Sequence, residues 1–217
     1  MKQKRHLEIV VAIGIVCIAG AVWYSLDSTR PPRPAREMTP LKPGSAVAAK
    51  ILAGAKSQQG THYNQSYVQI SYPGGDLRSD RGACTDVVVR ALRKTGIDLQ
   101  KLIHEDMARG FRSYPQNWGL SKPDTNIDHR RVPNQMTFLR RYGQTLTTSV
   151  SGSALKSWQP GDVVYWDTGS RLHTGIVSDR RNGWGHPFVI HNGWMCVEED
   201  ALTRWEIIGH FRYPKPK

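Results

Sequence analysis

Cys84 is followed at once by apolar residues at helical spacing, and this position could make its thiol chemically active. In a helix that begins at Thr85, positions 84, 88, 91 and 92 share one face, which is apolar apart from the thiol. The free N–H groups and the dipole at a helix N-terminus stabilise an anion, and they can lower a thiol pKa from about 8.5 to about 3.5. Cys84 is therefore a candidate nucleophile, and an inert core cysteine is the alternative.

Two histidines are placed to complete such a site. Nucleophilic catalysis needs a base and a group that orients the base. His173 opens the strand-like HTGIVSD, just after QPGDVVYWD, and His191 lies near the end of PFVIHN. Neighbouring strands would bring the two imidazoles together, with His173 as base and His191 as its orienting partner. Structural histidines, or a zinc site of both histidines with an aspartate, are the alternatives.

A charged segment, NIDHRR, is a candidate substrate-binding region. Arg130 and Arg131 could bind a substrate carboxylate through paired N–H donors. We add Asp86, Asp128 and His129 as candidate substrate-binding residues. A loop held together by its own salt bridges is the alternative interpretation.

The pattern of apolar residues predicts which elements position these groups. Helices are expected over 45–58, from Cys84 to about Gly96, over 98–111 and over 134–141, with a loop between 112 and 133. Strands are expected within YVQISYPGG (67–75) and over 161–167, 173–179, 187–192 and 206–213. Helices first and consecutive strands later predict an α+β fold, with helices packed on an antiparallel sheet.

The first 44 residues read as a targeting segment and a tether. Lys2, Lys4 and Arg5 precede an apolar run from 9 to 26, which is either an uncleaved anchor or a removable signal peptide. Residues 27–44 hold five prolines and are expected to be an extended linker. We therefore divide the chain into a segment 1–26, a linker 27–44 and a domain 45–217. The domain is expected outside the cytoplasmic membrane, in the periplasm or an equivalent space.

The net charge and the cysteines indicate which partners the domain meets and whether its thiols are reduced. The net charge of +12 favours anionic partners, such as the cell wall or lipid head groups. Nucleic acid is disfavoured because no nucleic-acid-binding signature is present. A solvated basic surface is the alternative. In the exported part only Cys84 and Cys196 carry thiols, and we expect both to be reduced in an active protein.

The order of these motifs resembles the NlpC/p60-type cysteine peptidases of bacterial cell walls, within the papain-like superfamily. The matching stretches are ACTDVVVRA, QPGDVVYWD, HTGIVSD and VIHN, within residues 80–192. From about Tyr63 to Tyr213 the chain more closely resembles an uncharacterised family of exported bacterial proteins in that superfamily. CTDVVVRALRKTGIDLQ, WGLSKPDTNIDHRRVPN and IIGHFRY carry this second resemblance.

The resemblance implies a papain-like fold with the nucleophile at the start of a central helix. It implies Cys84 as nucleophile, His173 as general base and His191 as the residue that holds the imidazole. The implied substrate is an amide bond of peptidoglycan stem peptides or cross-links, and no cofactor is needed. Transfer or hydrolysis of a lipid acyl group and a non-catalytic wall-binding module are the alternative functions. One departure is Asp86, which stands where those enzymes have a small residue.

Overall fold

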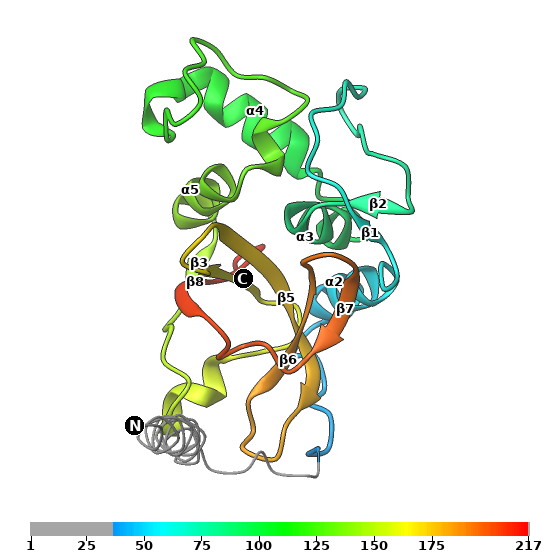
Figure 1. Ribbon diagram of the computed structural model, residues 1–217. Coiled ribbons are helices and arrows are strands. Elements are labelled where there is room, and N and C mark those ends of the chain that lie inside the picture. The colour runs from blue at the N-terminus through cyan, green and yellow to red at the C-terminus, as the bar shows by residue number, and fades with distance from the viewer. Residues whose placement is uncertain (1–36, 217) are drawn as a thin grey trace, which may run out of the picture. The chain divides into compact units, whose positions relative to one another are not determined.

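A six-stranded antiparallel sheet organises residues 37–216, the part of the chain that the computed structural model describes (Figure 1). The strand order is β3-β8-β4-β5-β6-β7. The strands are β3 (Gln144–Thr145), β4 (Val163–Asp167), β5 (Leu172–Arg181), β6 (Pro187–Asn192), β7 (Cys196–Glu199) and β8 (Glu206–Arg212). The expected α+β class with an antiparallel sheet is confirmed.

In the described part of the chain, four α-helices accompany the sheet. They are α2 (Ala46–Lys56), α3 (Cys84–Arg93), α4 (Leu99–Gly110) and α5 (Val132–Tyr142). Side-chain oxygens of Ser45 and Asp98 accept backbone N–H groups at the starts of α2 and α4, which explains where these helices begin. Helix α5 begins two residues earlier than predicted, because Pro133 fits the first turn, where its missing N–H costs no helical bond. Short 3₁₀ turns cover Phe111–Ser113, Asp128–Arg130 and Gly152–Ser157.

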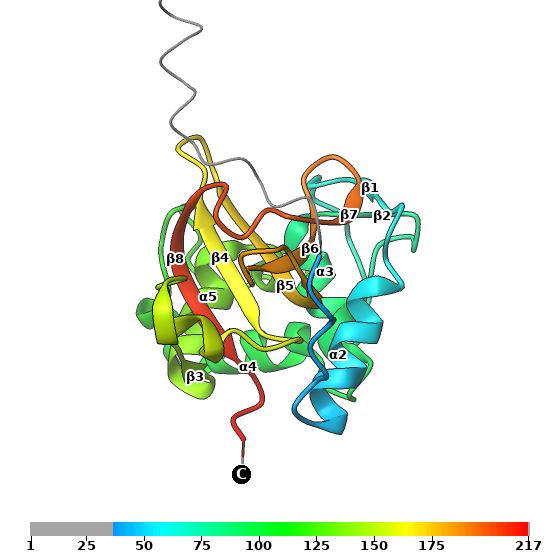
Figure 2. The same ribbon diagram turned by 90° about the horizontal axis from the view of Figure 1, so that it is seen from below.

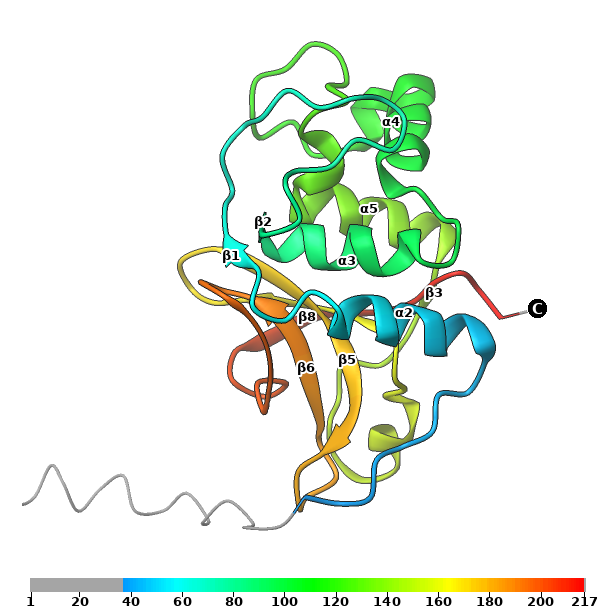
Figure 3. The same ribbon diagram turned by 90° about the vertical axis from the view of Figure 1, so that its right-hand side faces the viewer.

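Apolar residues alternate along the strands and build a core on each face of the sheet. On β4, Val163 and Tyr165 belong to the core shared with the helices, while Val164 and Trp166 belong to a second core with Trp158 and Leu202. Figure 3 shows α2 and α3 lying across one face, and Figure 2 shows β8, β4, β5 and β6 side by side. The sheet is therefore covered on both faces.

Helix α3 is the element that places Cys84. Its apolar face, with Val88, Ala91 and Leu92 fully buried, packs against β5 and β6. The helix begins at Cys84 itself rather than at Thr85. The backbone N–H of Ala83 donates to the Asp86 carboxylate at 2.6 Å, which satisfies one of the free donors at the helix start. The thiol thus lies at the first turn of a helix buried on the sheet, as the sequence indicated.

The prediction of a strand within 67–75 was wrong. This segment is irregular because side chains take its backbone groups: Ile70 N–H donates to Asn126 Oδ1, and Gln100 donates to the Ser71 carbonyl. Strands β3 and β7 were not predicted, nor was a two-residue parallel pair, β1 (His62–Tyr63) with β2 (Arg81–Gly82). Most of these are too short for alternation to show.

The predicted targeting segment 1–26 and the linker up to residue 36 lie outside the described residues. Between residues 37 and 216, no helix combines the length and the hydropathy needed to cross a membrane.

Candidate active site

His173 and His191 lie side by side on adjacent strands. In the antiparallel pairing of β5 with β6, His191 is opposite Gly175, two residues beyond His173. Nε2 of His173 lies 2.8 Å from Nδ1 of His191, and both residues are about 97% buried, with exposed fractions of 3%. The expected juxtaposition of the two imidazoles is confirmed.

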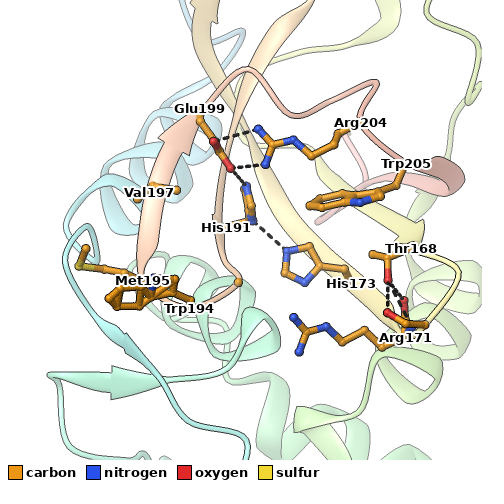
Figure 4. A pocket seen from close by; sticks show the side chains of 12 residues that line it. Thr168, Arg171, His173, His191, Trp194, Met195, Val197, Glu199, Arg204 and Trp205 are labelled. Carbon is orange, nitrogen blue, oxygen red and sulfur yellow. Dashed lines mark hydrogen bonds and ion pairs between the residues drawn. The ribbon is translucent and has the colours of Figure 1, made fainter. Parts of the chain in front are cut away.

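The histidine pair continues into a carboxylate held by an arginine (Figure 4). Nε2 of His191 lies 3.0 Å from Oε1 of Glu199, on β7. The Arg204 guanidinium donates to both oxygens of that carboxylate, at 2.6 and 2.9 Å. This bidentate contact fixes the orientation of Glu199.

This arrangement determines the protonation state of each ring nitrogen. A carboxylate only accepts, so His191 must donate from Nε2 to Glu199, and in its neutral form its Nδ1 must accept. His173 therefore donates from Nε2, and its Nδ1 carries a free lone pair. Nδ1 of His173 makes no hydrogen bond to any residue between 37 and 216. His173 is thus held as a base with its accepting nitrogen available.

Aromatic rings surround the two histidines and keep them neutral. Trp166 stacks on His173 at 5.8 Å between ring centroids, and Trp205 meets both imidazoles edge to face. Burial lowers the pKa of His173 to about 3, assisted by the neighbouring His191 and by Arg171. Burial also lowers the pKa of His191, against the opposing effect of Glu199. Both imidazoles are therefore uncharged at neutral pH.

The thiol of Cys84 is buried against β5, and it is not the pre-formed thiolate that its position suggested. Only 5% of Cys84 is exposed, and burial raises its pKa to about 11. The backbone N–H groups of Thr174 and Thr85 point at the sulfur and lower the pKa in part. Desolvation outweighs the helix start here, because the charged form loses its water.

In the described part of the chain, the Cys84 sulfur and the His173 ring form no hydrogen bond. The sulfur contacts the N–H of Thr174, the residue after His173 in β5. Cysteine and base therefore come from adjoining parts of α3 and β5, with a gap between their reacting atoms. Such loose contacts are common before substrate binds.

A pocket of about 470 Å³ opens over the histidines and the ends of their strands. Trp194, which is 68% exposed, forms part of its rim, and the Arg171 side chain extends toward His173 (Figure 4). Arg171 also lies 5.5 Å above the ring of Tyr63. The lining is completed by Thr168, Ser170, Gly193, Met195, Val197, Glu199, Arg204 and Trp205.

Asp86 and Arg130 form a buried ion pair instead of facing this pocket. Their side chains are 4% and 1% exposed, and the guanidinium donates to the carboxylate at 3.0 to 3.2 Å. Arg130 also donates to the carbonyls of Asn64 and Ser66. Both side chains are thus committed to holding α3, the 3₁₀ turn at 128–130 and the segment 64–66 together.

The other three candidates of the NIDHRR segment also lie outside the pocket lining. Asp128 is buried and accepts from Arg131, whose guanidinium stacks 4.0 Å from the centroid of Trp118. His129 is 2% exposed, and burial lowers its pKa to about 4. These contacts support the alternative interpretation of the segment as a loop joined by its own salt bridges.

The two thiols are unpaired, and the described residues offer no metal site. Cys84 and Cys196 are both free and buried. Burial raises the pKa of Cys196 to about 12. Over residues 37–216, no cluster of three or more histidine, cysteine or acidic side chains has an arrangement suited to a metal ion.

Arg171, Glu199, Arg204 and Trp205 are site residues that the sequence analysis missed. Glu199 reaches His191 because β7 returns along β6 in an antiparallel hairpin, with His191 opposite Val197. The only signal in the sequence was the acidic VEED (197–200) after the turn-like NGWM, which begins six residues beyond His191.

Comparison with known proteins places the chain. A family model described as "Domain of unknown function (DUF1287)" matches residues 51–213, which include Cys84, His173 and His191. A relative from Escherichia coli (strain K12), described as "Uncharacterized protein YijF", is 50% identical over 167 residues, which cover 75% of this chain and 80% of the relative. The chain belongs to the DUF1287 family.

Proposed function

We propose that this protein is a cysteine hydrolase that cleaves amide bonds in peptidoglycan stem peptides or cross-links, with a papain-like, NlpC/p60-type site. The observation that carries the proposal is the ordered row from Arg204 through Glu199 and His191 to His173. This row leaves Nδ1 of His173 without a hydrogen-bond partner among the described residues, on the strand against which the helix of Cys84 packs. A histidine held only for packing would not need a partner that fixes its tautomer.

The protonation states favour general-base catalysis over a resting thiolate–imidazolium pair. At neutral pH Cys84 is a thiol and His173 is neutral. As substrate closes the gap, Nδ1 of His173 takes the thiol proton while the sulfur attacks the amide carbonyl. The imidazolium then returns that proton to the leaving amine, which gives an acyl-enzyme, and water releases the acyl group. Glu199 stabilises the charge that develops on the histidine pair.

Two groups near Cys84 are candidate donors to the developing oxyanion. The Thr85 N–H at the start of α3 points at the sulfur. The Tyr63 phenol is half-buried beside it: burial, then the charge of a Cys84 thiolate, raises the phenol's pKa. The Tyr63 hydroxyl donates to Gln65 at 3.0 Å, and we include it as the candidate side-chain donor to the oxyanion.

The location in the cell forms part of the same proposal. The basic start, the apolar run and the proline-rich linker support export and a tether to the inner membrane, with the domain facing the periplasm. A net charge of +12 suits the anionic wall polymer.

The test uses the full chain in detergent with muramidase-released peptidoglycan fragments and, separately, anionic phospholipid vesicles. Mass spectrometry should detect new amine and carboxyl ends in the fragments, and the Cys84→Ala chain should release none. Acyl release from lipid alone would instead support the acyl-transfer alternative. Binding of fragments without cleavage by the wild-type chain would support the non-catalytic alternative.

A further inference from the structure

We propose that Arg171 binds a carboxylate of the substrate next to the bond that is cleaved, so that the pocket selects an anionic acyl or amine group. This inference deepens the proposed hydrolysis and rests on it. It transfers the carboxylate-binding role, which the sequence suggested for Arg130 and Arg131, to a residue on the turn between β4 and β5.

The charges that line the pocket leave one cation without a partner. Three lining residues are ionised: Arg171, Arg204 and Glu199. Arg204 and Glu199 neutralise each other through two short contacts. Arg171 has no carboxylate within 4.0 Å among residues 37–216, and it is exposed. The pocket therefore carries a net positive charge, and this charge is available to a ligand.

Arg171 is close enough to the reacting groups for its charge to act on them. After burial, its charge is one of the influences that lower the pKa of His173, and it also opposes the burial that raises the pKa of Cys84. The guanidinium lies 5.5 Å above the Tyr63 ring. A carboxylate bound here would lie beside the scissile amide rather than at a distant subsite.

The backbone that carries Arg171 is held in place. Thr168 closes the turn: its N–H and hydroxyl donate to the Arg171 carbonyl at 3.0 and 2.9 Å, and its hydroxyl accepts the Arg171 N–H at 3.2 Å. Gly169 donates to Asp167 at 2.8 Å. Because the backbone of the turn is already ordered, binding of an anion has to order only the Arg171 side chain.

The other candidate arginines are already occupied. Arg130 is buried against Asp86, and Arg131 pairs with Asp128 while it stacks on Trp118. Neither lines the pocket. Arg171 is thus the arginine of the described pocket that is free to provide a bidentate contact to a planar carboxylate.

The test compares two synthetic stem peptides that differ only in one carboxyl group, free in one and converted to a carboxamide in the other. Full-length wild-type, Arg171→Gln, Arg171→Lys and Arg140→Gln chains are assayed for kcat/KM.

We expect wild type to prefer the carboxylate peptide by about 10- to 100-fold, the range for a hydrogen bond to a charged group. Arg171→Gln should lower that ratio to about one, by losing activity on the carboxylate peptide alone. Arg171→Lys should restore part of the ratio, and Arg140→Gln, an exposed control on α5, should keep it.

A binding measurement separates this inference from the proposed hydrolysis. Dissociation constants of both peptides are measured with Cys84→Ala and with Cys84→Ala/Arg171→Gln chains, by tryptophan fluorescence. Tighter binding of the carboxylate peptide that depends on Arg171, without turnover by wild type, would support the anion site and reject hydrolysis. An equal ratio in wild type and Arg171→Gln, or no binding of either peptide, would overturn the assignment of Arg171.

Discussion

Glu199 Oε1 lies 3.0 Å from Nε2 of His191, and this contact determines which nitrogen of His173 is free to accept a proton. The carboxylate is on β7, whereas the two histidines are on β6 and β5. Each of these three strands thus supplies one side chain to a hydrogen-bonded row, in which His173 donates to His191 and His191 donates to Glu199. The row ends at Nδ1 of His173, so the carboxylate acts on the chemistry through two rings without touching the substrate.

The first prediction concerns Glu199→Gln. An amide can either accept from His191 or donate to it, so the ring pair would populate both tautomers and only one leaves Nδ1 of His173 bare. We expect kcat to fall roughly tenfold with little change in KM, since the effect lies on proton transfer. ¹⁵N NMR of the imidazoles should show the mixed tautomers. Glu206→Gln, on the exposed side of β8, is the control; unchanged ¹⁵N shifts in Glu199→Gln would contradict the tautomer argument.

The second prediction is a ranking of the three central side chains. Cys84→Ala should abolish turnover with the fold retained, because alanine favours a helix and only the sulfur is lost. His173→Ala should reduce kcat by about 10³-fold, within the range for loss of a general base. His191→Ala should reduce it less, because His191 orients the base without transferring the proton to substrate. Rates on peptidoglycan fragments, with circular dichroism as a folding control, test the order. Wild-type turnover by Cys84→Ala would show that Cys84 is only a core residue.

The third prediction follows from the raised pKa of Cys84. With a pKa of about 11, the thiolate fraction should rise about tenfold for each pH unit between 7 and 10. The rate of alkylation by iodoacetamide should rise in parallel, because the thiolate is the nucleophile. Mass spectrometry of the Cys84 peptide gives the rate, and the urea-unfolded chain gives the reference. A plateau already reached at pH 7 would indicate a thiolate–imidazolium pair.

Much of the fold follows from patterns of residues that are close in the sequence. The spacing of apolar residues and the position of turn residues account for the apolar face of α3 and for the four long strands. They also account for the helix starts at Ser45 and Asp98, whose side chains cap α2 and α4. The neighbouring strands in turn predicted that His173 and His191 meet. These features need only the geometry of a single helix or of two adjacent strands.

The parts that sequence reasoning missed depend on contacts between distant segments. The pKa of Cys84 is decided by burial against β5, which lies about ninety residues further along the chain, and helix position alone indicated the opposite direction. Arg130 resembled an exposed substrate ligand until its pairing with Asp86, 44 residues earlier, became visible. Glu199 ends the four-residue strand β7 and Arg171 lies on the turn between β4 and β5, and both segments are too short to show periodicity. Charge placement in three dimensions is therefore the part of this site that the sequence alone did not reveal.

The fourth prediction tests whether Arg130 is structural. Arg130→Met would leave the Asp86 carboxylate buried without its cation, which typically costs about 3–5 kcal/mol of unfolding free energy. The double variant Asp86→Asn/Arg130→Met should lose less than the sum of the single losses, because no unpaired charge remains. Arg140→Met, at an exposed position on α5, is the control with a smaller loss. Urea unfolding compares wild type with Asp86→Asn, Arg130→Met, the double variant and the control. An Arg130→Met chain of wild-type stability with a raised KM would restore the substrate-binding interpretation.

The fifth prediction concerns acid stability and His129. Its side chain is 2% exposed, and its buried Nδ1 has no hydrogen-bond partner among residues 37–216. Burial, followed by the charge of Arg130, lowers its pKa to about 4. Below the unfolded pKa of about 6.5 the unfolded chain takes up a proton that the folded chain refuses, so stability falls with pH until about pH 4. At pH 5 this loss of unfolding free energy amounts to roughly 2 kcal/mol for one histidine.

His129→Leu removes the titrating ring and keeps an apolar side chain of similar size. We expect the variant to lie within about 1 kcal/mol of wild type at pH 7. Between pH 7 and pH 5 it should gain roughly 2 kcal/mol relative to wild type. Urea unfolding at both pH values measures the difference, and an equal difference at the two values would show that His129 does not titrate in this window.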